Sequence, residues 1–322
     1  MRRPRVLQAF TKAEYEKAHQ LLATKVAFMM GRKFEEGDWA DVYCGAKGIP
    51  TGGWSNLNID AVYSCIGIEH KMLRPAGNKL VRNVFGTRLM HPSATRSIRI
   101  EEGEANEVMQ EVLIQYADFL EQRREFVRQR CPEGEPDLRT GWVLWQSNLK
   151  EFVYFEEEIL IPSSDDFIAE WHENEGRGAR KESRSLWIYE KETGQKKYSV
   201  TTSAGAKIQP YFDVPPASDP NIYYFKVQGE EFKPGLIRMW IPAATARELE
   251  RLAGGLSTEK LEAVIAHSKA ELRESRPIYS VNREEASTII LTKASYDFLE
   301  DLFPGAVGDA HRIQLLLAQL SQ

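Results

Sequence analysis

The stretch LNIDAVYSCIGIEHKML (57–73) is central to the fold, because two short apolar segments in it carry charges that strands normally exclude. In the second segment apolar and polar residues alternate, which is typical of a β-strand with two different faces. The alternation places Glu69 and Lys71 on one face, roughly 7 Å apart along the strand. It places His70 on the opposite face among apolar residues. We therefore expect His70 to belong to the core and not to act as a catalytic base.

The first segment ends near Ser64-Cys65, where a turn would let the two segments pair as an antiparallel hairpin. In that register Asp60 lies directly opposite Glu69, with the two side chains about 5 Å apart. Two carboxylates and the ammonium group of Lys71 would then converge on one point.

Composition describes a folded protein of one large domain or two ordinary ones, with 322 residues and 42% apolar residues. No run approaches the roughly 18 apolar residues that span a bilayer, and the start, MRRPRVLQAF, lacks a long apolar region. We expect a cytoplasmic protein with no membrane partner. Cys44, Cys65 and Cys131 are far apart and form no CxxC pair, which predicts neither a disulfide framework nor a structural zinc site.

Positive charge is concentrated in two places, although the net charge is −5. Residues 70–100 contain no acid but hold seven cations: Lys71, Arg74, Lys79, Arg82, Arg88, Arg96 and Arg99. The segment 173–185 contains a second group: Arg177, Arg180, Lys181 and Arg184. Both groups are candidates for contacts with DNA phosphates or bases, and both could equally be solvated surface charges.

The pattern of elements predicts an α/β (α+β mixed) fold, with a central mixed sheet flanked by helices and an additional β-rich and helical C-terminal region. Glycines and Pro50 indicate loops over 37–53. We expect one unit over 1–165 and a second over 166–322, unless the two form one continuous domain. Helices are expected over 11–30, 103–130, 243–253, 258–275 and 294–320. Strands are expected over 141–146, 151–161, 207–214, 222–228 and 236–241, with a hairpin over 185–202.

An acidic pair beside a lysine suits phosphodiester hydrolysis. Carboxylate oxygens bind Mg²⁺ and leave positions for water and a phosphate oxygen. A lysine close to this ion can orient the attacking water or help to deprotonate it. The chain has no Walker A loop, GxGxxG, GxSxG or HExxH motif, so we expect no nucleotide cofactor.

Asp60, eight intervening residues and Glu69-x-Lys71 on an apolar strand resemble the motif of the PD-(D/E)xK nuclease superfamily, to which type II restriction endonucleases belong. The resemblance covers roughly residues 10–160 and implies a restriction-endonuclease-like sheet with one or two Mg²⁺ per site. It makes 1–165 the expected catalytic unit and 166–322 the expected region for DNA recognition or dimerisation. It assigns Asp60, Glu69 and the main-chain carbonyl of His70 to the metal, and Lys71 to the water. Ile59 stands where the superfamily often has proline.

Some members of this superfamily add a glutamate from the N-terminal helix. Glu14 and Glu16 are the candidates here for that accessory acid. Glu14 also fits the capping-box position after Thr11, which gives it a structural explanation.

Two alternatives concern the motif. Glu231-Phe232-Lys233 is a second ExK, but Pro234-Gly235 follows it and places it in a turn. The trio Asp60, Glu69 and Lys71 could also be a cross-strand ion pair on a solvated sheet face.

The function expected from the sequence is a Mg²⁺-dependent, sequence-specific endonuclease of double-stranded DNA, a type II restriction enzyme. Palindromic sites are read most simply by a two-fold dimer, so we expect a homodimer. The alternatives are a structure-specific repair or recombination nuclease, and a non-catalytic nucleic-acid-binding protein.

Overall fold

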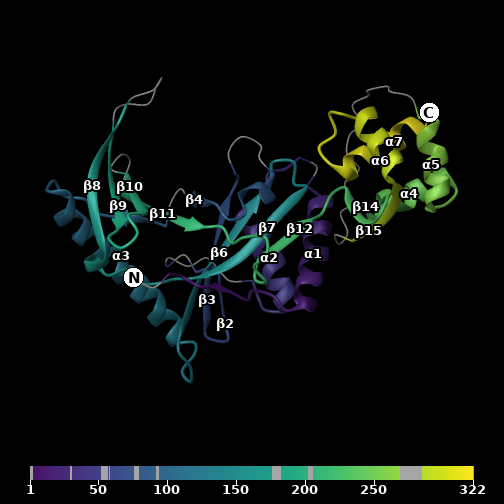
Figure 1. Ribbon diagram of the computed structural model, residues 1–322. Coiled ribbons are helices and arrows are strands. Elements are labelled where there is room, and N and C mark those ends of the chain that lie inside the picture. Colours follow the sequence, from purple (N-terminus) through teal and green to yellow (C-terminus); the bar gives the residue numbers. More distant parts are fainter. Residues whose placement is uncertain are drawn as a thin grey trace.

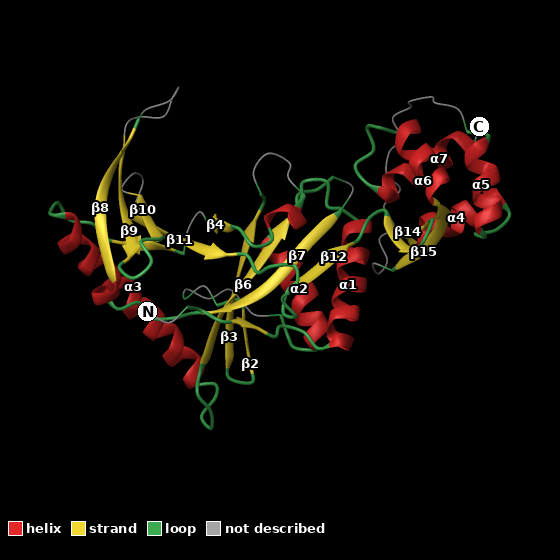
Figure 2. Cartoon of the chain, in the orientation of Figure 1, coloured by secondary structure: helices red, strands yellow, loops and turns green. Residues whose placement is uncertain are grey.

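The computed structural model (Figures 1 and 2) describes residues 3–29, 31–51, 57, 59–75, 80–91, 94–175, 183–201, 206–268 and 285–321, without the side chains of 96 and 97. The described chain has seven α-helices and fifteen strands in three sheets, so the predicted mixed α/β class is confirmed. No helix in these ranges is long and apolar enough to cross a membrane.

The helices are α1 Lys12–Ala27, α2 Glu36–Lys47, α3 Ala105–Arg128, α4 Ala243–Ala253, α5 Thr258–Ala266, α6 Lys293–Leu302 and α7 Asp309–Leu320. The strands of the first half are β1 Val6–Leu7, β2 Ala61–Tyr63, β3 Ile66–Leu73, β4 Arg88–Met90, β5 Thr95–Ile98, β6 Asp137–Trp145 and β7 Glu151–Glu158. The strands of the second half are β8 Phe167–Asn174, β9 Ser183–Glu190, β10 Lys196–Thr201, β11 Ala206–Asp213, β12 Tyr223–Lys226, β13 Glu230–Lys233, β14 Leu236–Pro242 and β15 Ala286–Thr292.

The first sheet has the strand order β1-β7-β6-β3-β2, with β12 also pairing with β7. It is mixed, because β3 and β6 run parallel while the other pairs are antiparallel. Helix α3 lies between β3 and β6 in the chain and is part of the long crossover that a parallel pair requires. Helices α1 and α2 cover one face of this sheet, and the C-terminal turns of α3 pack on the other.

The second sheet, β8 to β11 with β4 and β5, is antiparallel and lies at the left in Figure 1. Its apolar face packs against α3, where Leu186, Ile188 and Val200 contact the stripe that includes Val112 and Leu120. Helix α3 therefore joins two layers. The third sheet, β13-β14-β15, forms a separate core with α4 to α7 at the right in Figure 1.

The hairpin of β2 and β3 has the register that the sequence predicts. Ala61 pairs with Ile68 and Tyr63 with Ile66, which leaves Ser64 and Cys65 as a two-residue turn. Both turn residues have positive φ, 44° and 66°, as tight hairpin turns require. The amide of Asp60 donates to the carbonyl of Ile68 (2.8 Å), so Asp60 continues the antiparallel register opposite Glu69.

Helix α1 begins as expected. The Thr11 side chain accepts from the Glu14 amide, and the Glu14 carboxylate accepts from the Thr11 amide (2.7 Å) in a capping box. The helix buries Ala18, Leu22 and Val26 against the first sheet.

Three sequence expectations about helices are wrong. Within the expected loop 37–53 the chain forms α2, whose Trp39 and Tyr43 are buried. The helix expected over 294–320 is interrupted after Leu302, because Pro304 cannot continue it and disfavours a helical conformation at the preceding residue. The helix expected over 258–275 ends at Ala266, and residues 269–275 lie outside the described residues.

Two further expectations need correction. Cys65 and Cys131 form a disulfide, with their Cα atoms 5.0 Å apart, because the crossover brings the end of α3 back to the β2–β3 turn. Cys44 is buried and is not part of this disulfide. The second ExK, Glu231-Phe232-Lys233, belongs to strand β13 and not to a turn, since the turn follows it.

Candidate active site

The charged motif lies on β3 at the middle of the first sheet, where strand alternation separates its residues. His70 is 2% exposed and packs beneath α2, with its ring centroid 4.8 Å from that of Tyr43. The prediction that His70 is a core residue is therefore confirmed. Glu69 and Lys71 point to the other face, where Glu69 is 5% exposed and Lys71 half-buried.

The Glu69 carboxylate is held between two cations. Lys71 Nζ pairs with Oε1, and a guanidinium nitrogen of Arg123 lies 2.8 Å from Oε2. Arg123 belongs to α3 and is 2% exposed, and its Nε also donates to the carbonyl of Leu57 (2.6 Å). This arginine therefore anchors the crossover helix to β3 and to the segment that leads into β2.

Arg123 was not identified from the sequence. A signal for it exists, because Tyr116, Leu120, Arg123 and Val127 follow one another at helical spacing on the buried face of α3. A charge on such a stripe needs a counter-charge, which Glu69 supplies. Gly67 allows the helix to approach so closely, since a Cβ there would clash with Val127.

Asp60 lies at the open end of the hairpin, immediately before β2 begins. Its Oδ2 accepts the His70 amide at 2.5 Å and so takes the place of a ladder carbonyl. Burial raises the pKa of Asp60 to about 6, and the negative charges of Glu69 and Glu36 act in the same direction, whereas the His70 amide acts against them. The ionised form of the Asp60 carboxylate is therefore disfavoured, and a cation beside it would stabilise that form.

A cleft of about 410 Å³ opens above Glu69 and Lys71. One wall is the first sheet with the end of α3, and the other is formed by β10 and β11 of the second sheet. Lys197, Tyr198 and Tyr211 belong to this second wall. Asp60 is not among the described residues that line the cleft.

Glu157 is a further acid of this cleft that the sequence reasoning did not single out. Register pairs Glu69 with Thr140 and Thr140 with Glu157, so the two glutamates lie in one row across the sheet. The Trp142 indole donates to Glu157 (3.0 Å). Burial raises the pKa of Glu157, against the opposing effect of Lys197. The sequence contained a signal for Glu157, because strand alternation places it on the opposite face of β7 from its neighbours Glu156 and Glu158.

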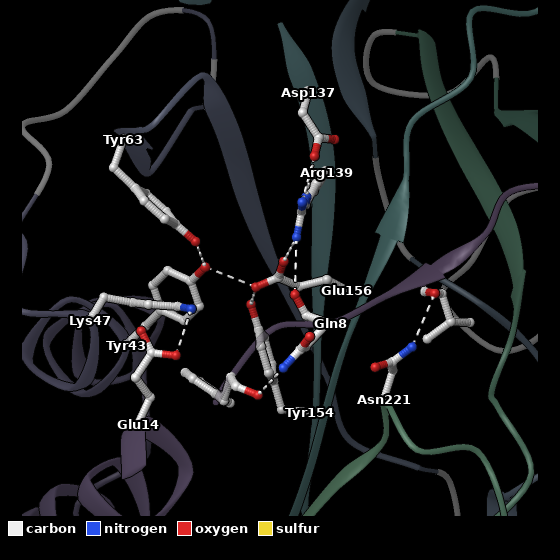
Figure 3. A network of polar contacts seen from close by, with 12 residues as sticks. Gln8, Glu14, Tyr43, Lys47, Tyr63, Asp137, Arg139, Tyr154, Glu156 and Asn221 are labelled. Atoms are coloured by element: carbon white, nitrogen blue, oxygen red, sulfur yellow. Dashed lines mark hydrogen bonds and ion pairs between the residues drawn. The ribbon is translucent and has the colours of Figure 1, made fainter. Parts of the chain in front are cut away.

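The opposite face of the same strands carries a closed polar network (Figure 3). Glu156 is fully buried and accepts hydrogen bonds from Tyr43 (2.8 Å), Tyr154 (3.1 Å) and Arg139 (2.8 Å). Arg139 is in turn paired with Asp137. Burial raises the pKa of Glu156 in spite of Arg139.

The candidate accessory acids on α1 have other surroundings. Glu14 serves the capping box and pairs with Lys47 (3.2 Å), while Glu16 lines a groove between α1 and β14. Glu36, at the start of α2, is the helical acid whose charge acts on Asp60. The roles predicted for Glu14 and Glu16 stay predictions.

The cations of the basic run 70–100 and of the second group 173–185 are spread over several surfaces. Arg82 lies 3.4 Å from Glu151, and Arg88 pairs with Asp213 (3.1 Å) and with Gln195 (2.6 Å). Arg99 is exposed, Arg184 stacks on Trp171, and Arg74 lines a different groove. Lys79, Arg177, Arg180 and Lys181, and the side chain of Arg96, lie outside the described residues. Of the described cations in the run, Lys71 alone lines the cleft.

The residues that could hold a metal ion are those with oxygen atoms near Asp60. The described residues contain no group of three or more His, Cys, Asp or Glu side chains that could hold a metal ion. Asp60 and Glu69 with the His70 carbonyl give two carboxylates and one main-chain oxygen. Mg²⁺ keeps several waters and is typically bound by one or two carboxylates, so this donor set fits it.

Comparison of the chain with protein-family models, with curated proteins and with solved structures gives no match.

Proposed function

We propose that this protein is a Mg²⁺-dependent endonuclease that cleaves double-stranded DNA, of the type II restriction class. The observation that carries the proposal is the placement of Asp60 and Glu69 at opposed positions of one hairpin, beside Lys71 at the edge of a cleft. The order of elements around it, helix, motif hairpin, helix and further strands, agrees with the resemblance to the PD-(D/E)xK superfamily.

In the proposed mechanism Asp60, Glu69 and the His70 carbonyl would hold Mg²⁺. When bound, the ion would neutralise charge that develops on the phosphate during hydrolysis. Lys71 would hold the attacking water or its proton, which requires that its ammonium leave Glu69 for the cleft. Arg123 would keep Glu69 in place, because it is buried and bound to the carbonyl of Leu57 as well.

A second candidate function is non-catalytic binding of nucleic acid. It is favoured by the pairing of both Lys71 and Arg123 with Glu69, since the motif then forms a self-sufficient ion-pair cluster. In that case Asp60 serves the sheet edge through the His70 amide.

Cleavage of plasmid DNA in Mg²⁺ by the wild type and by two variants separates these functions. Lys71→Ala should lower the cleavage rate by about 10²- to 10⁴-fold. Asp60→Asn should lower it at least as much, although its amide oxygen can still accept the His70 amide. Lys47→Ala is a matched control outside the cleft and should cleave as the wild type does.

Equal cleavage by all four proteins would contradict the assignment of Asp60 and Lys71 to the active site. Binding that weakens with salt, without any cutting in Mg²⁺, would favour the non-catalytic alternative. Discrete fragments from DNA of mixed sequence would support the restriction class, and selective cutting of flaps or junctions would contradict it. A homodimer, which the proposal includes, should appear in sedimentation of the protein bound to a palindromic duplex.

A further inference from the structure

A groove of about 450 Å³ lies where the first sheet meets the C-terminal helices, apart from the proposed active site. It is formed by the loop after α1, the end of β3, the β6–β7 turn and the connection between α6 and α7. Among the described residues that line it, every charged one is a cation, and these are Arg32, Lys33, Arg74, Lys150 and Arg312.

The acids that pair with these cations lie outside the groove lining. Arg32 binds Asp38 through two bonds (2.7 and 3.0 Å). Lys150 binds Glu300 (2.7 Å), which also pairs with Arg312 (3.0 Å). Asp309 is a third acid behind the groove. Five cations against three acids leave two positive charges in excess.

The excess can be traced to two side chains. Lys33 and Arg74 are both exposed, and no acid in the described part of the chain pairs with either of them. They come from different elements and meet on one groove. Long-range electrostatics therefore favour an anionic ligand at this position.

The walls of the groove are fixed relative to one another. Gln228 donates to the carbonyl of Asn148 (2.8 Å) in the β6–β7 turn and accepts from the amide of Asp309 (2.9 Å) at the start of α7. Asn148 Oδ1 accepts the amide of Lys150 (3.0 Å). These bonds link the first sheet to the C-terminal helices, so the elements that carry Lys150 and Arg312 are held together before any ligand binds.

We propose that this groove binds phosphate groups of a DNA backbone. Several cations along one groove suit a ligand with repeated negative charges, and arginine and lysine are the usual phosphate contacts. Arg74 follows Glu69 by five residues, which is about 16 Å along an extended strand and close to the length of about five base pairs. The choice of DNA rests on the proposed function, but the groove itself requires no catalysis.

Equilibrium binding of a labelled duplex to the full chain, in EDTA over a series of salt concentrations, tests the proposal. The double variant Lys33→Gln/Arg74→Gln removes two exposed cations without breaking an ion pair. Each lost phosphate contact should reduce the slope of log K against log salt by about 0.9, so the slope should fall by about two. The control Arg251→Gln/Lys293→Gln removes the same charge from surface pairs outside the groove and should keep the wild-type slope.

An unchanged slope in the double variant would overturn the proposal. Displacement of the duplex by inorganic phosphate at constant ionic strength would overturn it too, because the groove would then serve a small phosphate ligand. A wild type that shows the expected slopes but cuts no DNA in Mg²⁺ would support the groove and reject only the proposed catalytic function.

Discussion

The two faces of the first sheet carry the same kinds of charged residues in different surroundings. Strand β3 sends Glu69 and Lys71 to one face and His70 to the other, while β7 sends Glu157 and Glu156 apart in the same way. Beneath α1 and α2 the charges are sealed, and Glu156 has three donors and no exposure. On the other face the acids border a cleft.

This difference shows that burial of a charge does not by itself identify a functional site. Glu69 and Glu156 are both almost fully buried and both pair with an arginine. What separates them is the second partner. Glu156 is held by tyrosine hydroxyls inside the core, whereas Glu69 pairs with Lys71, a long side chain that reaches an open cleft.

The largest effect expected from this comparison is on stability at the sealed face. Glu156→Ala removes the acceptor that Arg139, Tyr43 and Tyr154 share, and breaking a buried pair costs about 3 to 5 kcal/mol. Urea unfolding measures the free energy lost. Glu156→Gln should lose less, because its amide oxygen still accepts from the tyrosines.

The rate of the proposed DNA cleavage per folded molecule should stay the same in both Glu156 variants. A loss below about 1 kcal/mol in Glu156→Ala would mean that the network does not stabilise the fold. A selective loss of cleavage would mean that the two faces are not independent.

A medium effect is expected on the pH dependence of stability at the cleft face. Burial raises the folded-state pKa of Glu157 above its unfolded value of about 4.3. The folded state then holds this proton more tightly, so the free energy of unfolding of the wild type falls, relative to Glu157→Gln, as the pH rises from about 4 through the raised pKa. The loss is about 1.4 kcal/mol for each tenfold difference in proton affinity between folded and unfolded protein.

Urea unfolding of both proteins between about pH 4 and about pH 8 checks this dependence. Parallel stability curves would contradict it, and a wild type that gains stability with pH would reverse the sign of the argument.

The smallest effect is expected at Glu14. This residue belongs to α1, which covers the face of the first sheet that carries the buried network of Glu156. Glu14→Ala removes the carboxylate of the capping box and should cost about 1 kcal/mol. DNA cleavage should not change, because this carboxylate is occupied by the Thr11 amide and Lys47. Loss of cleavage at unchanged stability would instead support Glu14 as the accessory acid of the proposed metal site.

Local signals were sufficient for the hairpin and for the first helix. The alternation around Glu69, and a turn at Ser64-Cys65, determine which side chains share a face and where Asp60 must pair. The capping box at Thr11 is likewise encoded within four residues. These features depend on neighbours in the chain, and the sequence contains those neighbours.

Features that depend on distant residues were missed. Gly45 indicated a loop, but it is the point where α2 approaches α1, since a Cβ there would lie 2.9 Å from Leu21. Arg123 and Lys197 reach the cleft from α3 and β10, which are placed by tertiary packing. Strand β8 was not predicted, because its residues 167–174 directly follow the boundary expected between the units 1–165 and 166–322.

The parallel pairing of β3 with β6 has a consequence for the order in which the chain can assemble. Ile66 pairs with Asp137 and Leu73 with Leu144, so the motif strand finds its neighbour only after about seventy further residues are made. Such distant contacts form slowly, because the entropy cost of closing a long loop comes before the contacts can stabilise the chain. A nascent chain that ends before β6 would therefore expose Glu69 and Lys71 on an unfinished sheet.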